Sequence, residues 1–379
     1  MRLLINCLSS ISGGAVTYLR NLLPKLVKEV RLIDKSVDVA LLYHVVQRDL
    51  FPSEMDVHRL ELAGRRSAGL SRAIREAITL RRIARAEQAD VVFTPYQAGS
   101  LPQGLRHILM LRNMEPFRFR KYSYGFHGAV RNALLEKWSA YCLQHAERVI
   151  AVSDYAYACA EQELRVDRRR LSVVYHGRDP AFDAQPGRSV GEVQDTPPLP
   201  FPYILSVGSL LPYRRAEDII EAFSAHVAQR APNLHVVFAG DSSEETYKRY
   251  LRQKTRASPY PQRIHFLGNV PSRALPALYR GASCYIAATE IEACPNAVIE
   301  ALASSCPIVA SRTPPLPEIL RDAAMFYEPR NLGELGLAIR KVIADPSVSE
   351  ALSRSAWQRA HHFSWDACAK KTARVLMDW

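Results

Sequence analysis

Short apolar runs alternate with longer amphipathic stretches along most of the chain. The runs are continuous rather than alternating, which is typical of strands in a parallel sheet that is covered on both faces. Strands are predicted over residues 3–7, 37–43, 90–94, 107–111, 148–152, 171–175, 203–207, 234–239, 264–267, 284–288, 307–310 and 325–327. Apolar positions at helical spacing predict helices over residues 16–29, 70–85, 129–144, 156–164, 216–229, 244–255, 272–280, 297–304 and 332–344.

This order of strands and helices predicts an α/β fold of two doubly wound, Rossmann-like domains. Prolines and glycines crowd residues 186–202 and sustain neither a helix nor a central strand, so this segment is the predicted linker. The first domain is expected over residues 1–185 and the second over 203–362. The amphipathic helix over 363–379 is expected to pack back on the first domain. Ligands of such sheets bind at the carboxyl ends of the strands, so a cleft between two facing domains is the expected site.

Composition narrows the class of protein. The 379 residues are 48% hydrophobic, which supports two cores and excludes disorder. Seven cysteines without a CxxC pair indicate neither a disulfide framework nor a zinc site, so the cytoplasm is the expected compartment. The apolar N-terminus is interrupted at Asn6 and is too short for a signal peptide. No run of 18 apolar residues predicts a membrane-spanning helix.

Positive charge is concentrated in the first half. The chain carries a net charge of +12, and residues 1–190 alone hold 29 Lys and Arg against 19 Asp and Glu. Such a balance favours an anionic partner. Two basic groups stand out, and their members are Arg65, Arg66, Arg72, Arg75, Arg81, Arg82 and Arg85, followed by Arg112, Arg118, Arg120 and Lys121 beside Phe117, Tyr122, Tyr124 and Phe126. They suit an anionic membrane surface, and solvated surface arginines are the less favoured alternative.

Two turns could hold an anion. Gly13 and Gly14 lie between the first strand and its helix, where backbone amides can approach a phosphate. The two glycines could also form an ordinary strand-to-helix turn that binds no ligand. The third glycine of the dinucleotide-binding fingerprint is absent, so NAD binding is not supported. Arg214 and Arg215 follow a strand of the second half and could clamp a diphosphate, unless they are merely the solvated start of a helix.

The stretch over residues 289–303 is the most informative. A strand leads into a loop with Glu292, Pro295 suits the opening of a helix, and Glu300 falls within that helix. Glu300 stands among apolar residues, so burial with a partner is favoured over exposure. Backbone amides would meet an anion here while the two carboxylates accept hydrogen bonds from the hydroxyl groups of a sugar or a ribose.

Several motifs together resemble the retaining glycosyltransferases of family 4, which have the GT-B fold. They span residues 3 to about 365, so nearly the whole chain is covered. Each motif is weak by itself. The motifs are the Gly13-Gly14 turn, Val207-Gly208 with Arg214, Phe238-Ala239-Gly240, Phe266-Leu267-Gly268-Asn269-Val270, the Glu292-x7-Glu300 pair, and Pro307-Ile308-Val309-Ala310-Ser311 with Leu316-Pro317-Glu318-Ile319.

The resemblance implies donor-binding roles for residues of the second domain. Glu292 would contact hydroxyls of the donor sugar, Glu300 the nucleotide ribose, and Arg214 the diphosphate. Ser209 stands where the family has a second arginine, so one phosphate contact is missing or comes from Arg215. The loop and helix start with Cys294, Asn296, Ala297 and Val298 would cap phosphate or sugar, and Gly240 with Asp241 would lie near the base. The first domain would then bind the acceptor.

For catalysis, the resemblance implies transfer with retention, in which the leaving diphosphate takes the proton of the acceptor. Glu292, Arg214 and Asn113 are the expected catalytic residues. Asn113 replaces a histidine found in many relatives, and an asparagine cannot act as a base. His127 and His176 are possible substitutes, although a single histidine is more often structural. Neither a metal ion nor a further cofactor is expected, since the sequence has no DxD motif between a strand and a loop.

The predicted function is therefore transfer of a hexose or deoxyhexose from a nucleotide diphosphate sugar to a saccharide acceptor. The resemblance and the basic first half imply a lipid-linked acceptor in surface polysaccharide or O-antigen assembly, with the enzyme peripheral at the inner face of the cytoplasmic membrane. Two alternatives stay open. One is another GT-B enzyme, such as a sugar phosphorylase or a nucleotide-sugar epimerase. The other is a basic nucleic-acid-binding protein, but no recognition motif for a specific nucleic acid is present.

Overall fold

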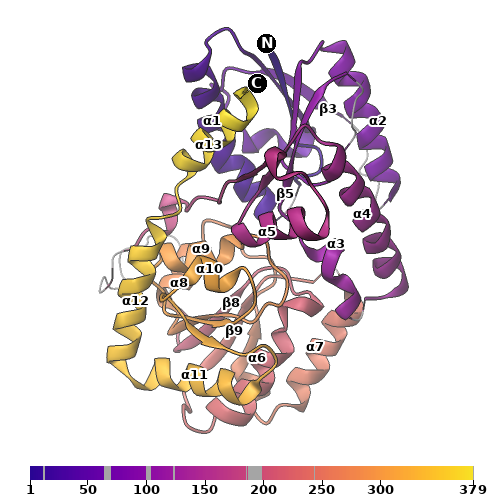
Figure 1. Cartoon of the computed structure of the whole chain (residues 1–379). Coiled ribbons are helices and arrows are strands. Elements are labelled where there is room, and N and C mark those ends of the chain that lie inside the picture. Colours follow the sequence, from indigo (N-terminus) through magenta and orange to yellow (C-terminus); the bar gives the residue numbers. More distant parts are fainter. Residues whose placement is uncertain are drawn as a thin grey trace. The chain divides into compact units, whose positions relative to one another are not determined.

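The computed structural model describes residues 1–11, 13–63, 70–99, 104–122, 124–184, 186, 199–242 and 244–378, with the backbone alone for 70–74. The chain divides into two compact units (Figure 1). Unit 1 comprises Met1–Phe119, Phe126–Gly177 and Ser364–Trp379, and unit 2 comprises Arg120–Gly125 and Arg178–Phe363. Each unit has a parallel sheet flanked by helices, which confirms the predicted fold class of two Rossmann-like domains.

The division between the units differs from the boundary predicted at residue 185. Residues 178–184 belong to unit 2 because they are bonded to it: the amide of Ala184 donates to the Ala303 carbonyl at 3.0 Å, and the ring of Phe182 packs against Tyr279. Most of the predicted linker, residues 187–198, lies outside the described residues.

The sheet of unit 1 has seven parallel strands in the order β3-β2-β1-β4-β5-β6-β7. The register pairs Leu3 of β1 with Val39 of β2 on one side and with Val91 of β4 on the other. The chain order therefore reverses direction at β1, which is the topological switch point of this sheet. The strands are β1 (Arg2–Asn6), β2 (Asp38–His44), β3 (His58–Leu62), β4 (Val91–Thr94), β5 (Arg106–Leu111), β6 (Arg148–Ala151) and β7 (Leu171–Val173).

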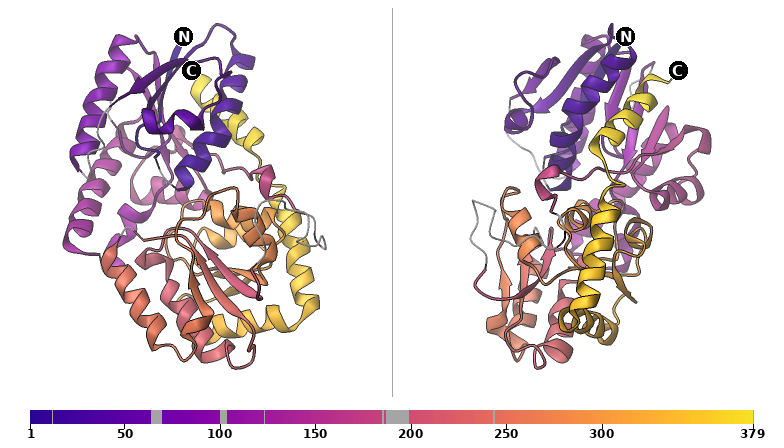
Figure 2. Two further views of the ribbon diagram at one scale, coloured as in Figure 1. Left: turned by 180° about the vertical axis from the view of Figure 1, so that it is seen from behind. Right: turned by 90° about the vertical axis from the view of Figure 1, so that its left-hand side faces the viewer.

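Helices cover both faces of this sheet. Figures 1 and 2 show α1 and α13 on one face and α2 and α4 on the other. The C-terminal helix α13 lies along α1, where Trp365 meets the ring of Tyr18 edge-on at 5.6 Å. Leu80 and Ala84 of α2 pack on the opposite face against Leu4 of β1. The helices are α1 (Gly14–Ile33), α2 (Leu70–Ala86), α3 (Glu115–Arg118), α4 (Phe126–His145), α5 (Asp154–Ala158) and α13 (Trp365–Met377).

The sheet of unit 2 has six parallel strands in the order β10-β9-β8-β11-β12-β13. Its core is built from continuous apolar strands such as β9, whose residues Val236 and Phe238 are fully buried. The direction reverses at β8, which pairs with β9 on one side and β11 on the other. The strands are β8 (Tyr203–Val207), β9 (His235–Ala239), β10 (Ile264–Phe266), β11 (Cys284–Ala287), β12 (Ile308–Ser311) and β13 (Met325–Tyr327).

Seven helices flank this sheet in the described part of unit 2. They are α6 (Ala216–Ala222), α7 (Glu245–Ala257), α8 (Leu275–Gly281), α9 (Asn296–Ala303), α10 (Leu316–Leu320), α11 (Leu332–Ala344) and α12 (Pro346–Ala360). The helix predicted over 216–229 is in fact α6 followed by a π-helical turn over Phe223–Val227. In the part of the chain that the structure describes, no helix combines the length and the apolar character needed to cross a membrane.

Candidate active site

A pocket opens at the switch point of unit 2, beside the carboxyl ends of β8 and β11. Residues 206–210 at the end of β8 form one wall, and residues 285–289 at the end of β11 form another. Arg214, Ala216, Glu292, Pro295 and Val298 complete the lining. In open α/β sheets this is where ligands bind, because loops on either side of the reversal diverge and leave a crevice.

An ion pair lies in this pocket. Nη2 of Arg214 is 3.1 Å from Oε1 of Glu292, and the two side chains are only 25% and 9% exposed. Burial raises the pKa of Glu292, and the neighbouring guanidinium partly opposes that effect. For Arg214, burial lowers the pKa, but the negative charge of Glu292 outweighs it and the net pKa is raised. Both groups are therefore suited to act as a charged pair.

The hydrogen-bonding capacity of this pair is not used up by the protein. Oε1 of Glu292 lies 3.1 Å from Nη2 of Arg214, but among the described residues neither this oxygen nor Nε of Arg214 makes a hydrogen bond of good geometry, although both atoms are buried. Buried polar atoms without partners are costly, so native structures retain few of them and each requires an explanation. A bound ligand that offers hydroxyl groups to Glu292 and an anion to Arg214 would satisfy both atoms.

Two glycines bring the strand ends close together beneath Arg214. Gly240 has φ of 154°, and a Cβ placed there would be 1.9 Å from the Gly208 carbonyl oxygen. Gly208 in turn has φ of 125°, and a Cβ there would lie 2.7 Å from the guanidinium of Arg214. A side chain at either position would push the turn or the arginine away, so both glycines are required to seat Arg214 in the pocket.

The loop that carries Glu292 is anchored on both sides. The Glu290 amide donates to the Tyr213 carbonyl at 2.8 Å, and the Glu290 carboxylate accepts two hydrogen bonds from Arg330. Ser311 donates to the Thr289 carbonyl at 2.6 Å. These contacts fix the backbone immediately before Glu292, so the carboxylate is held in place before any ligand binds.

Glu300 is placed one turn into α9. Its Oε2 accepts a hydrogen bond from the Tyr279 hydroxyl at 3.2 Å, and this hydroxyl also lies 3.0 Å from the Ala297 carbonyl. Desolvation raises the pKa of Glu300 to about 7, against the opposing effect of the Tyr279 hydrogen bond. The ring of Tyr285, which lines the pocket, lies 5.5 Å from the ring of Tyr279. The structure therefore places Glu292 and Arg214 in direct contact and connects Glu300 to the pocket lining through two adjacent tyrosines.

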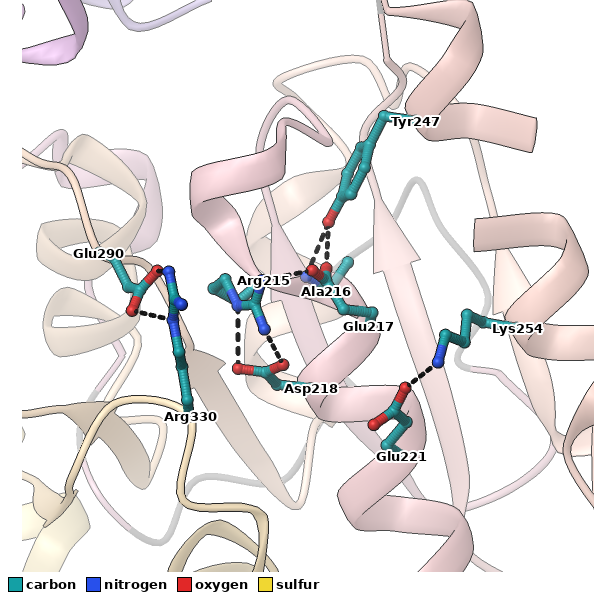
Figure 3. A network of polar contacts seen from close by, with 9 residues as sticks. All are labelled: Arg215, Ala216, Glu217, Asp218, Glu221, Tyr247, Lys254, Glu290 and Arg330. Atoms are coloured by element: carbon teal, nitrogen blue, oxygen red, sulfur yellow. Dashed lines mark hydrogen bonds and ion pairs between the residues drawn. The ribbon is translucent and has the colours of Figure 1, made fainter. Parts of the chain in front are cut away.

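Arg215 differs from Arg214 although the two are adjacent. Arg215 adopts a left-handed backbone conformation, with φ of 49°, that turns its side chain away toward α6. There it lies 2.7 Å from both Glu217 and Asp218 (Figure 3). Tyr247 donates a hydrogen bond to Glu217. Arg215 is thus bound to two carboxylates of α6, and we expect that it does not supply the phosphate contact that the resemblance implies for the exposed position 209.

Other predicted donor-binding residues surround the pocket in different ways. Val298 lines the pocket directly, and Asn296 and Ala297 begin α9, where backbone amides have no intrahelical acceptor. Cys294 is buried in the preceding loop. Asp241 follows Gly240 and pairs with Lys248 at 2.7 Å, a contact that lowers the Asp241 pKa. Its role near a base stays a prediction.

The predicted residues of unit 1 lie in a different setting. Gly13 caps the start of α1 and, with Gly14, is exposed, while Ser12 lies outside the described residues. Asn113 follows β5, and its side-chain oxygen accepts a hydrogen bond from the Glu115 amide at 3.0 Å. Asn113 therefore has a visible structural task in the turn before α3, and a catalytic role for it stays a prediction.

The two candidate histidines also have distinct surroundings. His176 is buried and its ring stacks on Trp365, with 5.9 Å between the ring centroids. His127 is exposed at the start of α4. The packing of His176 in an aromatic cluster favours the structural role that a single histidine usually has.

The second basic group predicted in unit 1 does not form one exposed patch. Glu163 binds the guanidinium of Arg118, with Nη1 and Oε2 2.7 Å apart. Arg112 lies over the ring of Tyr18 at 5.1 Å. Tyr122 packs against Tyr213 in unit 2. Of the first group, Arg65 and Arg66 lie outside the described residues, as does the side chain of Arg72.

Sequence reasoning missed two aromatic residues of the site. Tyr285 lies within β11 and resembles any apolar core position of a strand, yet it lines the pocket. Tyr213 carries the carbonyl that anchors Glu290, and its ring is 5.9 Å from the Arg214 guanidinium carbon. The sequence did contain one indication, because the hydroxyl group of a tyrosine in a buried strand, such as Tyr285, needs a hydrogen-bond partner.

Within the described ranges, no three His, Cys, Asp or Glu side chains gather as a metal ion would require.

Comparison with known proteins gives two family models that match successive parts of the chain. The model described as Glycosyltransferase Family 4 matches residues 12–182, and the model described as Glycosyl transferases group 1 matches residues 193–359. Among curated relatives, O-antigen chain mannosyltransferase B of Escherichia coli is 24% identical over 170 residues, which are 45% of this chain and 44% of that protein. The chain spans about half the length of the first curated relatives that it matches.

Solved structures match over nearly the full length. Sucrose-phosphate synthase from Thermosynechococcus elongatus is 16% identical, with a TM-score of 0.76 over 99% of this chain and 98% of that one. Anabaena Alr3699/HepE, solved in complex with UDP-glucose, is also 16% identical, with a TM-score of 0.73 over 98% of each chain. At such identity the likeness concerns the fold.

Proposed function

The chain belongs to family 4 of the glycosyltransferases, with the GT-B fold, and on this premise we propose that it transfers a hexose or deoxyhexose from a nucleotide diphosphate sugar to a saccharide acceptor. The observation that carries the proposal is the Arg214–Glu292 pair. It lines a pocket at the switch point of unit 2 and contains two buried polar atoms that make no hydrogen bond within the described part of the chain. A sugar linked to a diphosphate offers the hydroxyls and the negative charge that would meet them.

In the proposed complex, each group has one task. Arg214 binds the diphosphate, and the first amides of α9 add partial positive charge on the same side. Glu292 accepts hydrogen bonds from the hydroxyls of the donor sugar. Glu300, one turn further along α9, accepts from the hydroxyls of the ribose. The negative charge that builds on the leaving diphosphate is then met by preorganised groups, with no bound metal ion in the proposal.

We propose that transfer proceeds with retention. The acceptor hydroxyl approaches on the side of the leaving group, the bond from the anomeric carbon to the diphosphate oxygen breaks, and that oxygen takes the acceptor proton. Asn113 would orient a sugar hydroxyl, and the amides of Gly13 and Gly14 would contact the diphosphate. An inverted anomeric configuration in the product would contradict this part of the proposal.

The proposal extends to the acceptor and to the location of the enzyme in the cell. A relative named as an O-antigen chain mannosyltransferase supports a growing surface polysaccharide as the acceptor, and we propose that this acceptor is linked to a lipid. The enzyme would then work in the cytoplasm at the inner face of the membrane.

The experiment has two stages. First, UDP-, GDP-, dTDP- and ADP-sugars are compared for the rise in melting temperature that each produces. The best donor is then incubated with saccharide acceptors, and the product is examined by mass spectrometry and by NMR of the anomeric proton. A glycosylated acceptor supports the proposal. Turnover only with inorganic phosphate, epimerisation of the donor alone, or stabilisation by an oligonucleotide but by no nucleotide sugar would each contradict it.

A further inference from the structure

Glu290 connects the two loops that carry Arg214 and Glu292. Its amide donates a hydrogen bond to the Tyr213 carbonyl at 2.8 Å. Tyr213 immediately precedes Arg214, and Glu290 lies two residues before Glu292. This hydrogen bond and the ion pair of 3.1 Å in the pocket therefore close one ring through the two loops. Any movement of Glu290 relative to Tyr213 changes the alignment of the ion pair.

The carboxylate of Glu290 is held from outside this ring. Its Oε1 and Oε2 accept hydrogen bonds from Nε and Nη2 of Arg330 at 2.8 and 2.9 Å (Figure 3). Such a fork-shaped contact fixes both the position and the direction of a carboxylate, which a single hydrogen bond does not. The side chain of Glu290 is only 12% exposed, and that of Arg330 is 52% exposed. Without the arginine, a nearly buried charge would lose its partner, and the loop would have to move to expose it.

The backbone is strained at the point from which Arg330 reaches Glu290. The φ of Arg330 is 66°, in the left-handed region that residues other than glycine seldom adopt. The turn around it is fixed, because the Asn331 amide donates to the Glu328 carbonyl at 3.0 Å and the Asn331 side chain accepts from the Glu334 amide at 3.1 Å. Strained backbone of this kind persists only where the surrounding structure holds it, and it is concentrated at functional sites.

An aromatic ring packs beside the Glu290–Arg330 pair. The guanidinium carbon of Arg330 is 6.0 Å from the centroid of the Tyr122 ring, and this ring meets that of Tyr213 edge-on at 6.3 Å. Tyr122 is one of the residues 120–125, which belong to unit 2. Burial and then the charge of Glu290 raise the pKa of Tyr122, so its hydroxyl stays neutral. An aromatic neighbour keeps water from one side of the ion pair, which strengthens the attraction between its charges.

We propose that Arg330 is a positioning residue of the donor site. It is not part of the pocket lining and acts through Glu290: by holding this carboxylate, it keeps Glu292 aligned with the donor sugar. The inference rests on the proposed transfer from a nucleotide diphosphate sugar and adds to it a charge that lies outside the pocket. A displacement of about 1 Å at a positioning group can cost about 10²-fold in rate, so the effect of losing this arginine is measurable.

The first measurement does not depend on catalysis. Hydrogen–deuterium exchange of the full chain without ligand compares Arg330→Gln with the wild type by mass spectrometry. Peptides that cover residues 289–295 should exchange about ten-fold faster in the variant, since the loop is no longer held through Glu290. Arg312→Gln is the matched control, because Arg312 is 54% exposed and its partner Glu328 is 58% exposed. This control removes an ion pair from the same turn and should leave the exchange of residues 289–295 unchanged.

The second measurement is kinetic. It uses the donor identified among the UDP-, GDP-, dTDP- and ADP-sugars, and the nucleoside diphosphate of the same base. Arg330→Gln should lower kcat about ten- to a hundred-fold, because Glu292 is no longer aligned with the reacting sugar. Binding of the nucleoside diphosphate should change by less than about two-fold, because this probe has no sugar for Glu292 to contact. Arg330→Lys keeps the charge without the fork and should have an intermediate kcat.

Three outcomes would overturn the proposal. The first is wild-type exchange of residues 289–295 in Arg330→Gln. The second is a wild-type kcat in Arg330→Gln, or an equal fall of kcat in Arg312→Gln. The third is nucleoside diphosphate binding that weakens as much as kcat falls, which would make Arg330 a binding residue.

Two further results are assigned in advance. If Arg330→Gln fails to fold by circular dichroism, Glu290→Gln replaces it under the same criteria. If the wild type transfers no sugar from any of the four donors, the proposed function is wrong, and the exchange of residues 289–295 still decides whether Arg330 positions the loop of Glu292.

Discussion

Arg214 and Arg215 are neighbours in the chain and opposites in the structure. Arg214 lines the pocket and forms an ion pair with one carboxylate, Glu292, and two buried atoms of this pair make no hydrogen bond among the described residues. Arg215 turns away through a left-handed backbone conformation and is bound by two carboxylates, Glu217 and Asp218 (Figure 3). Arg214 and Glu292 can therefore still form hydrogen bonds with a ligand, whereas the donors that Arg215 directs at Glu217 and Asp218 are already used.

The comparison shows that two adjacent positive charges can serve different purposes, one in ligand binding and the other in stability. A basic pair in a turn looks like one phosphate clamp in the sequence, yet only one member keeps its donors for a ligand. Unmet hydrogen-bonding capacity in a buried place, rather than charge as such, identifies the functional residue. Substitutions at the two arginines should therefore affect different properties.

The largest expected effect is on catalysis by Arg214→Ala. Loss of its donors should lower kcat/KM about 10²–10³-fold, because the leaving diphosphate loses a preorganised positive group. Arg214→Lys keeps the charge beside Glu292 and should retain more activity than Arg214→Ala while folding normally. Steady-state kinetics with the identified donor measure this difference, and circular dichroism confirms the fold. Near wild-type kinetics in Arg214→Ala would contradict the claim that Arg214 binds the leaving diphosphate.

Arg215→Ala should act on stability. It leaves Glu217 and Asp218 buried without their cation, and we expect a loss of about 2 kcal/mol, or about 4–8 °C in Tm. The control is Arg312→Ala, since the Arg312–Glu328 pair is exposed and should contribute little. Differential scanning calorimetry compares them. A fall in kcat/KM as large as that of Arg214→Ala, without a fall in Tm, would mean that Arg215 binds the donor after all.

Glu300 gives a smaller effect that depends on pH. Ionised Glu300 accepts hydrogen bonds from a ribose better than the neutral acid does, so nucleotide-sugar affinity should fall as the pH falls through about 7. Glu300→Gln should bind about ten-fold more weakly at high pH and lose this dependence. Titration calorimetry at several pH values measures both. Unchanged pH dependence in Glu300→Gln would assign the titration to another group.

The same carboxyl affects stability with a defined sign. Its pKa of about 7 in the folded state lies above the ordinary value of 4.5, so the folded state holds the proton more tightly. The stability that the protonated acid contributes is fully present below about pH 4.5 and is lost as the pH rises through about 7. Without ligand, Glu300→Gln should therefore raise Tm at high pH and have little effect at low pH.

The smallest effect is expected from removal of divalent cations. In the proposal Arg214 and the amides of α9 meet the charge of the diphosphate, so a chelator should leave the transfer rate unchanged. The control restores magnesium to the chelated enzyme. A rate that falls with the chelator and returns with the metal would show that Arg214 does not suffice.

The fold was largely predictable because buried parallel strands are continuous apolar runs. β8 and β13 have the predicted bounds, for example. β3 was missed because its residues His58–Leu62 form a partly exposed edge with polar and apolar residues in alternation. The π-helical turn over Phe223–Val227 was also missed, since a pattern of helical period does not register one extra residue in a turn.

The site was predictable in part. Glu292, Glu300 and Arg214 could be identified because their spacing follows strand ends, which parallel topology gathers on one edge of a sheet. The ion pairs of Arg215 could not be predicted from the sequence. They depend on a left-handed φ at a residue other than glycine and on two carboxylates of the following helix. The role of Tyr285 depends on which atoms surround its hydroxyl, and a strand pattern contains no such information.

The most direct test of the central claim compares a nucleoside diphosphate with the corresponding nucleoside by titration calorimetry, using the base of the donor that stabilises the protein most. The account predicts that wild type and Arg215→Ala bind the diphosphate at least about ten-fold more tightly than the nucleoside, since charge-assisted hydrogen bonds supply that difference, and that Arg214→Ala loses the preference. A full preference for the diphosphate in Arg214→Ala would contradict the claim that this arginine and Glu292 form the donor site.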